Sequence, residues 1–150
     1  MASSIEQLSY EMTASALAEQ ERALAGLRTR AGTVIAAASV AASLLATHAA
    51  TNSAIWTVGL GLMFAISVGA AIAVLLPATL VFAYNGALIL TAADAAGDDD
   101  VAHAYRAAVA WMQTDLTRNR EVISRLAMWF YLSAGALVVE VLLWTVSIAR

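Results

Sequence analysis

The chain has 150 residues, of which 61% are hydrophobic and 13% are charged, and its formal net charge is −3. Soluble proteins average roughly 45–50% apolar and about 25% charged residues, so this composition excludes an ordinary soluble domain and is typical of a polytopic membrane protein. The absence of cysteine excludes disulfides and cysteine-zinc sites, and the absence of a dense basic tail argues against nucleic acid as a partner.

Residues 1–30 are largely polar and predict a cytoplasmic amphipathic helix rather than a secretory signal. An apolar stripe follows this helix and slips in register part-way along it: Ile5, Leu8 and Met12, then Leu17, Leu24 and Leu27. The slip argues against a long coiled coil and favours packing against another cytoplasmic helix.

Residues 31–50 and 54–76 predict two transmembrane helices, because each is long enough to cross a hydrocarbon core of about 30 Å. Small residues recur at every fourth position of the second helix: Gly61, Ala65, Gly69 and Ala73. Such a ladder lets two helix backbones approach closely in lipid, so we expect a tight two-span hairpin. In the first helix, a similar face is formed by Gly32, Ala36, Ser39 and Ser43.

Residues 77–126 predict a cytoplasmic connector and helix. The apolar stretch 78–93 is short, and if it crossed the membrane, the arginines from Arg106 to Arg125 would lie outside, against the positive-inside tendency. We therefore expect three spans and a cytoplasmic N-terminus, with residues 78–93 in or under the inner membrane interface.

The acidic run Asp98–Asp100 suits the positive N-terminal end of the next helix better than a metal site. An apolar stripe marks one face of that helix: Val101, Tyr105, Ala108, Met112, Leu116, Ile123 and Leu126. The helix is expected to run on into a third span, residues 127–149. The predicted fold is an all-α membrane protein with an N-terminal amphipathic helix, a two-span hairpin and a cytoplasmic helix that continues into the third span.

The third span contains one charged residue, Glu140. A carboxylate at the bilayer centre costs about 2.5–3.5 kcal/mol on insertion scales, so Glu140 is expected to face protein or water. Its helical face is otherwise small or polar, apart from an indole: Ser133, Ala136, Trp144 and Ser147. Two roles remain open. A protonated Glu140 could hydrogen-bond Ser39, Ser43 or a neighbouring subunit as a packing clamp, or a ring of Glu140 side chains could line an oligomeric pore.

A group of polar and aromatic residues near the inner membrane face is the candidate ligand site: Arg118, Asn119, Arg120 and Arg125, with Tyr105 and Trp111. The arginines could set topology and contact lipid headgroups, or they could bind an anionic ligand by charge-assisted hydrogen bonds. The aromatics could anchor at the interface or stack on a base. His48 and His103, the only histidines, fall on opposite sides of the membrane in this topology. We therefore expect no enzyme, no metal site and no cofactor.

Three stretches resemble small bacterial membrane effectors of the Pycsar type and the related SLATT group: "LAGLRTRAGTVIAAASVAAS" (24–43), "TRNREVISRL" (117–126) and "VVEVLLW" (138–144). The resemblance covers nearly the whole chain in layout. It implies a role in antiphage defence, in which a partner cyclase makes a cyclic pyrimidine mononucleotide (cUMP or cCMP) and the effector disrupts the inner membrane. Glu140 and Arg118-Asn119-Arg120 are the positions that match the family pattern.

The expected function is therefore that of a homo-oligomeric, multi-pass effector in the bacterial inner membrane, with the lipid bilayer and a cyclic mononucleotide as its partners. One alternative is a non-catalytic membrane scaffold, for instance an accessory protein of plasmid transfer. Another is a proton- or ion-linked transporter that uses Glu140.

Overall fold

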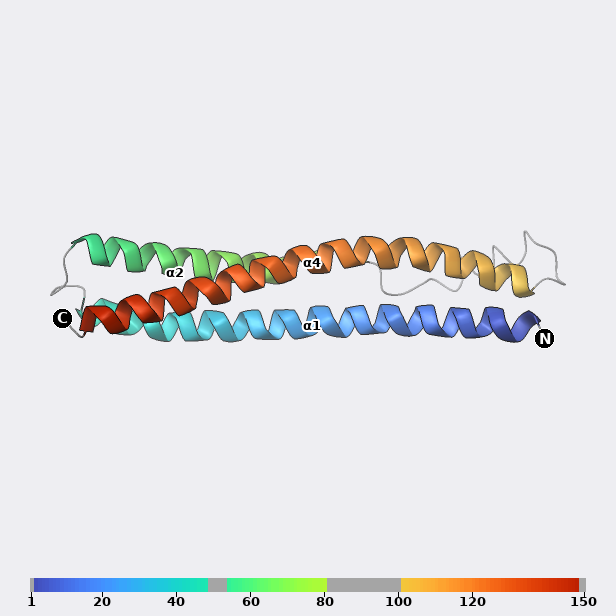
Figure 1. Cartoon of the computed structure of the whole chain (residues 1–150), viewed down its shortest axis with the longest axis horizontal. Helices are drawn as coiled ribbons and strands as arrows, with labels where there is room; N and C mark the ends of the chain where they lie inside the picture. The colour runs from blue at the N-terminus through green and yellow to red at the C-terminus, as the bar shows by residue number, and fades with distance from the viewer. Residues whose placement is uncertain (1, 49–53, 81–100, 149–150) are drawn as a thin grey trace. The chain divides into compact units, whose positions relative to one another are not determined.

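The computed structural model describes residues 2–48, 54–80 and 101–148, and all regular secondary structure in these ranges is helical. The helices are α1 (Ala2–His48), α2 (Ala54–Leu75) and α4 (Val101–Ile148), as shown in Figure 1. The predicted all-α fold class is confirmed for these residues. The predictions for the interfacial stretch 81–93 and for the acidic run Asp98–Asp100 concern positions outside them.

Helix α1 joins two elements that the sequence pattern separates, residues 1–30 and 31–50. Gly26 and Gly32 each cost about 1 kcal/mol relative to alanine in a helix, but the alanine-rich surroundings keep the helix continuous. Helix α4 also runs unbroken, through Arg125. At 1.5 Å per residue, α1 and α4 are each about 70 Å long, whereas α2 is about 33 Å long.

Helix α2 ends where proline forbids its continuation. The Leu76 backbone N–H donates to the Ile72 carbonyl at 3.0 Å and completes the last turn. Pro77 then disfavours a helical conformation at Leu76 and has no N–H of its own. The Arg28 guanidinium donates to the Leu76 carbonyl at 3.5 Å, and so satisfies a carbonyl that the helix end leaves without a partner.

Contacts divide the chain into two units, each described by itself below. Unit 1 comprises residues 1–24 and 78–123, and unit 2 comprises residues 25–77 and 124–150. Because α1 and α4 are long, each contributes its N-terminal half to unit 1 and its C-terminal half to unit 2.

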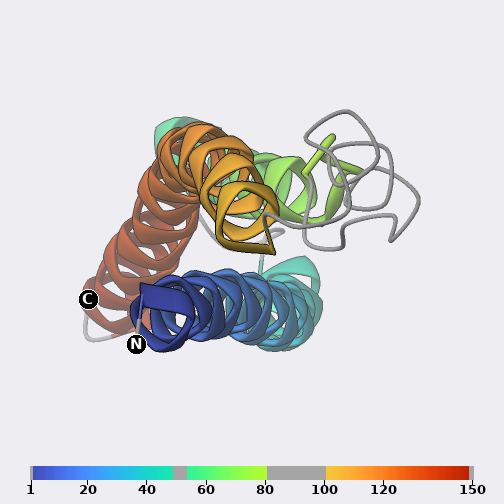
Figure 2. The same ribbon diagram turned by 90° about the vertical axis from the view of Figure 1, so that its right-hand side faces the viewer.

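The helical part of unit 1 consists of the N-terminal halves of α1 and α4, which run in the same direction. Figure 2 shows them from the ends at which they begin. Glu6 contacts Arg106 and Gln20 contacts Leu116, so the contacting positions increase together along both helices. The buried apolar residues are Leu17, Leu24, Ala104, Ala108 and Met112. Leu17 and Leu24 belong to the second part of the predicted α1 stripe, and Ala108 and Met112 to the predicted stripe of α4, whereas Leu116 and Ile123 of the latter are half-buried and Ala104 was not predicted.

The part of the α1 stripe that precedes the slip in register does not join this core. Ile5, Leu8 and Met12 are exposed. The slip rotates these three side chains away from the face that carries Leu17 and Leu24, because a helix repeats every 3.6 residues.

Unit 2 contains the C-terminal halves of α1 and α4 together with α2. One apolar cluster of this unit consists of Ala31, Ala71 and Val74, with Leu27, Ile35 and Phe130 packed against it. The buried polar residues of the unit are Ser67, Ser133 and Glu140. Many of its large apolar side chains are exposed, among them Val58, Leu62, Met128, Val138 and Leu142.

Among the described residues, two helices are long and apolar enough to cross a membrane. The qualifying segments are Trp56–Leu75 in α2, with a mean hydropathy of 2.4, and Ala102–Val146 in α4, with a mean hydropathy of 1.9 in its most apolar window. The predicted first span, residues 31–50, extends beyond the described residues and is not one of these two.

Candidate functional sites

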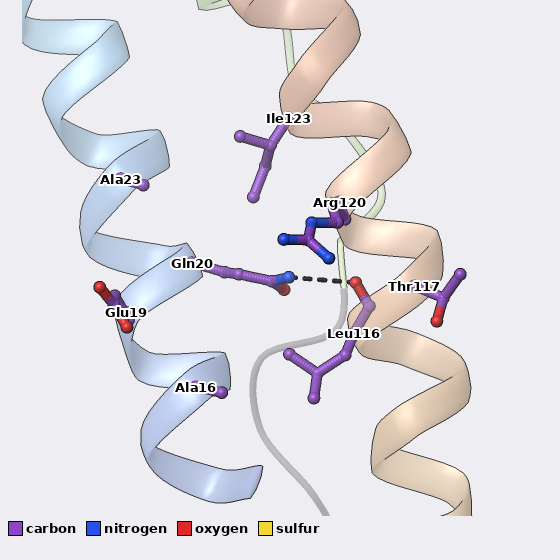
Figure 3. A pocket seen from close by; sticks show the side chains of 8 residues that line it. All are labelled: Ala16, Glu19, Gln20, Ala23, Leu116, Thr117, Arg120 and Ile123. Atoms are coloured by element: carbon purple, nitrogen blue, oxygen red, sulfur yellow. Dashed lines mark hydrogen bonds between the residues drawn. The ribbon is translucent and has the colours of Figure 1, made fainter.

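The larger groove of unit 1 lies between α1 and α4 and has a volume of about 570 Å³ (Figure 3). Its apolar lining is formed by Ala16, Ala23, Leu116 and Ile123. Its polar lining is formed by Glu19, Gln20, Thr117 and Arg120. The small alanines of α1 leave the space into which the longer side chains of α4 point.

Gln20 reaches from α1 across this groove. Its Nε2 donates to the Leu116 carbonyl oxygen at 3.0 Å. Its Oε1 is buried and has no hydrogen-bond partner in the part of the chain that the structure describes. If the amide were turned around, Oε1 would face the Leu116 carbonyl oxygen and two acceptors would meet. The hydrogen bond therefore determines which amide atom faces Leu116. Gln20 thus joins α1 to α4 through its amide N–H.

Arg120 supplies the positive charge. Figure 3 shows its guanidinium directed into the groove, beside the Gln20 amide. Within residues 2–48, 54–80 and 101–148, its side chain has no ion-pair or hydrogen-bond partner. Glu19 lies at the groove edge with its carboxylate turned away from Gln20, and the Thr117 hydroxyl donates to the Gln113 carbonyl at 3.0 Å. Among the described residues, the groove thus presents a cation without an ion-pair partner, Arg120.

Of the predicted ligand-site residues, Arg120 is the one that lines this groove. Arg118 and Arg125 are exposed, and Arg125 belongs to unit 2. Asn119 is only 1% exposed, so it is part of the packed face of α4. Gln20 was not predicted, because a single glutamine on a polar helix has no distinguishing sequence signal.

The two predicted aromatic residues do not line the groove either. The Tyr105 ring packs against Tyr10 with 5.5 Å between ring centroids, and Trp111 is exposed. Tyr105 therefore helps to join α1 to α4, and its predicted stacking on a ligand base stays untested.

A smaller groove of unit 1, of about 320 Å³, lies around Glu6 and Arg106. Its cation is already paired, since Arg106 Nη2 donates to Glu6 Oε1 at 2.8 Å and Arg106 Nε to the same oxygen at 3.3 Å. An anionic ligand would have to compete with this carboxylate, so the larger groove is the better anion site.

In unit 2, Glu140 is fully buried, at 0% exposure. Neither of its carboxyl oxygens has a hydrogen-bond partner among the residues that are described. The predicted bond to Ser39 or Ser43 is wrong within this chain. Both serines are exposed and donate to carbonyls of their own helix, those of Ile35 and Val40. Serine commonly satisfies itself in this way in a helix.

A reciprocal serine pair joins α2 to α4 in unit 2. The Ser133 hydroxyl donates to the Ser67 carbonyl at 2.6 Å, and the Ser67 hydroxyl donates to the Ser133 carbonyl at 3.1 Å. Both serines are fully buried. Ser133 was predicted on the contact face of α4, whereas Ser67 was not predicted because α2 is apolar around its whole circumference.

The small-residue ladder is not the face that α2 buries within this chain. Its members are half-buried (Gly61, Ala73) or exposed (Ala65, Gly69), and a Cβ atom built on Gly61 or Gly69 would meet nothing within 4 Å. The buried face is formed by Leu60, Ser67, Ala70, Ala71 and Val74. The tight two-span hairpin predicted from the ladder, and its predicted role in packing or pore formation, stay predictions. Trp144, also assigned to that role, is half-buried.

Comparison with known proteins gives no match to a family model, a curated protein or a solved structure. Function must therefore be inferred from the site residues. A guanidinium without a partner among the described residues and an apolar lining are groups expected for binding a small anionic molecule. The buried carboxyl of unit 2 is a group expected where helices pack or where ions pass.

Proposed function

We propose that unit 2 crosses the bacterial inner membrane as three spans, residues 31–50, 54–76 and 127–149. Two apolar helices of sufficient length support this proposal. So does the arrangement of side chains, in which Val58, Leu62 and Val138 are exposed while Ser67 and Glu140 are buried. A surface of this kind is unfavourable in water and favourable in lipid, where intramembrane polar groups face the protein interior.

The proposed orientation has a cytoplasmic N-terminus. In this orientation all arginines except Arg150 lie on the cytoplasmic side, in keeping with the positive-inside tendency. Helices of about 70 Å exceed a hydrocarbon core of about 30 Å, so α1 and α4 are long enough to extend beyond the membrane. Unit 1 would then form the cytoplasmic part.

The proposed function is a non-catalytic membrane effector of antiphage defence that perturbs the inner membrane when a cyclic pyrimidine mononucleotide binds. The resemblance in residues 24–43, 117–126 and 138–144 supports the class of function. The observation that carries ligand sensing is the groove of unit 1, where Arg120 can pair with a phosphate and the apolar lining can receive a base.

Ligand binding can act on the spans because α1 and α4 line the groove and continue without a break into residues 31–48 and 127–148. A ligand that prefers one packing of the two helices shifts the population toward that packing. A change from almost closed to almost open requires about 5.5 kcal/mol of differential binding. Several subunits can share this demand, which favours a homo-oligomer.

Glu140 supports a homo-oligomer as well. Its carboxyl oxygens are buried without a hydrogen-bond partner in the described chain, and the ladder residues Ala65 and Gly69 are exposed. A second copy can pack closely along the exposed ladder in lipid, and a repacking of α4 in the oligomer would open the Glu140 carboxyl to a donor of that copy. Glu140 then acts as a packing clamp between subunits or, in the open state, as part of a pore lining.

The test is leakage of dye and ions from liposomes that contain the purified protein, with and without a panel of cyclic mononucleotides. We expect leakage with a cyclic pyrimidine nucleotide and much weaker leakage for Arg120→Gln. Arg118→Gln is the matched control, because Arg118 is exposed and does not line the groove. Absence of ligand-dependent leakage from inserted, helical protein would contradict the effector function.

That negative result would favour a second candidate, a non-catalytic membrane scaffold such as a plasmid-transfer accessory protein. The exposed side chains of Ile5, Leu8 and Met12 support it, because an apolar stripe on α1 can pack against a partner helix. A scaffold of this kind would be tolerated in membranes without leakage.

A further inference from the structure

We infer that unit 1 packs against a second copy of this chain, so that the exposed face of α1 in one copy meets the exposed face of α4 in the next copy. The central contacts are those of Met12 with Ala110 and of Arg22 with Glu121. The inference rests on the proposed function for the membrane orientation and for the homo-oligomer. The choice of the two faces follows from the described side chains.

The first observation is an apolar stripe on α1. Ile5, Leu8 and Met12 are 70%, 56% and 65% exposed, whereas Leu17 and Leu24 on the other side of the helix are buried. The proposed topology places unit 1 in the cytoplasm, and a contiguous apolar surface in water marks a site of protein contact. The stripe is therefore expected to be covered by another helix.

The same face of α1 continues toward the proposed membrane with polar residues. Ser15, Glu19 and Arg22 follow Leu8 and Met12 at spacings of three or four residues, and all five side chains are exposed. Because a helix repeats every 3.6 residues, these five side chains share one face. A partner helix that covers the apolar part would thus also pass the polar part.

A complementary face lies on α4, on the side that points away from α1. It consists of Ala110, Thr114, Thr117 and Glu121, all exposed. The two threonine hydroxyls donate to carbonyls of their own helix, so they need no other acceptor. Side chains this small leave room for larger side chains of a neighbouring helix, such as that of Met12 in another copy.

The two faces also match in height. Within the chain, α1 and α4 run in the same direction, and their contacts join residues that are 95–100 positions apart, as for Tyr10 with Tyr105 and Glu6 with Arg106. Copies that are related by an axis along the membrane normal place the same residue at the same height. The offset then also holds between neighbouring copies, so Met12 lies level with Ala110, and Arg22 lies level with Glu121.

Charge favours this pairing over a contact between two copies of α1. Residues 1–24 contain four glutamates and one arginine, whereas residues 101–123 contain three arginines and two acidic residues. Two α1 helices side by side would bring like charges together, but α1 beside α4 brings unlike charges together. Arg22 and Glu121 have no ion-pair partner among the described residues, so each can pair with the next copy.

The first test is cross-linking of the full chain in liposomes with a short bismaleimide, since the chain contains no cysteine of its own. Met12→Cys combined with Ala110→Cys in one chain should give a ladder of covalent oligomers, because the two positions lie on outward faces and meet only between copies. Each single variant should stay monomeric in a denaturing gel. The control is Gln7→Cys with Ala110→Cys, since Gln7 is exposed on a different side of α1.

The second test reverses the charges. Arg22→Glu and Glu121→Arg should each weaken association by roughly threefold to tenfold, because an exposed ion pair becomes a pair of like charges. The two changes together should restore association to within about twofold of the wild type. Energy transfer between labelled chains in liposomes measures this. A role of either residue within its own helix would not produce such a rescue.

The outcomes separate this inference from the proposed function. Dimers formed by Met12→Cys alone would show that two α1 helices meet, and an absence of links in inserted, associated protein would show that something else covers the stripe. Either result, or a double reversal that does not restore association, would overturn the inference and leave ligand-dependent leakage intact. Absence of any association between wild-type chains would overturn the proposed homo-oligomer itself. The cross-linking pattern decides even if a charge variant does not fold.

Discussion

The two units differ in the polar residues that they bury and in the side chains that they expose. Unit 1 buries leucine, methionine and alanine, and leaves charged residues such as Arg118 and Arg120 exposed. Unit 2 buries apolar residues as well, such as Leu60 and Val74, but together with Ser67, Ser133 and Glu140, and it exposes aliphatic side chains such as Val138 and Leu142. The same two helices, α1 and α4, contribute to both units. The difference therefore arises along each helix.

The proposed change of solvent along the helices, from water around unit 1 to lipid around unit 2, would account for this difference. In water, each square ångström of buried apolar surface contributes roughly 25 cal/mol, so large aliphatic residues belong inside. In lipid that driving force is absent, and helices associate through small residues, close packing and interhelical hydrogen bonds. The reciprocal bonds of Ser67 and Ser133 are contacts of this second kind.

The largest expected effect comes from a charge on the exposed face of unit 2. Val138 is 58% exposed, and Val138→Arg should reduce membrane insertion by about 2.5–3.5 kcal/mol, because an arginine near the bilayer centre is costly. The matched control is Met12→Arg in unit 1, where Met12 is 65% exposed and the change should stay within about 0.5 kcal/mol. The inserted fraction of each variant is measured in a membrane-insertion assay. If both variants inserted into the membrane equally well, the proposed difference in solvent between the two units would be contradicted.

The next largest effect concerns the serine pair. Removing both hydroxyls by Ser67→Ala with Ser133→Ala should destabilise the helix packing of unit 2 by about 1–2 kcal/mol, since intramembrane hydrogen bonds average about 0.6 and reach about 1.7 kcal/mol. Unfolding in mixed detergent micelles, followed by circular dichroism, measures the change.

The control for the serine pair is Thr145→Ala. The Thr145 hydroxyl is exposed and donates within its own helix, to the Val141 carbonyl at 2.9 Å, so its loss should have little effect on packing. A double serine variant as stable as Thr145→Ala would show that the reciprocal bonds do not stabilise unit 2.

Substitution of Glu140 should change association and single-chain stability in opposite directions. Glu140→Leu removes a buried carboxyl without a described partner, so the single chain should become more stable. The same change should weaken homo-oligomer formation by roughly threefold to tenfold, because the contact proposed between subunits is lost. Glu140→Gln keeps hydrogen-bonding capacity and should largely retain assembly. Energy transfer between labelled chains in liposomes measures both variants, and unchanged association for Glu140→Leu would argue against an intersubunit role.

The smallest effect is expected for the ion pair of unit 1. Arg106 bonds Glu6 at 2.8 Å but is 65% exposed, so Arg106→Gln should cost less than about 1 kcal/mol and less still at high salt. Hydrogen exchange of the first turns of α1 measures the change. Arg118→Gln removes the same charge where no ion pair is described. A salt-independent loss of several kcal/mol in Arg106→Gln would mean that this pair is not exposed to water.

The helical segments could be predicted from the sequence because they depend on local properties. Pro77 and the apolar run before it determine where α2 ends, and the stripe from Ala108 to Leu126 determines which face of α4 turns inward. Continuity of α1 from the polar segment into residues 31–48 was not predicted, since the change in composition near Arg30 resembles a boundary although the backbone needs none.

The contacts between helices could not be predicted in the same way. Residues 54–76 are apolar on every side, so no periodicity distinguishes Ser67 and Ala71, which are buried, from Ala65 and Gly69, which are exposed. The ladder spacing indicates where two helices can approach, but the spacing does not say which helices. Gln20 was missed because its role depends on Leu116, a residue far away in the sequence.

Thiol labelling tests the contrast between the units most directly, because the chain contains no cysteine and a single one can be placed at will. The variants are Met12→Cys in unit 1 and Val138→Cys in unit 2, both at positions with an exposed side chain. Each is treated with a membrane-impermeant maleimide in sealed and in permeabilised cells. The proposed arrangement predicts that Met12→Cys reacts only after permeabilisation and that Val138→Cys reacts in neither, although both react in denaturing detergent. Rapid labelling of Val138→Cys in permeabilised cells would place the exposed aliphatic face of unit 2 in water and contradict the membrane assignment.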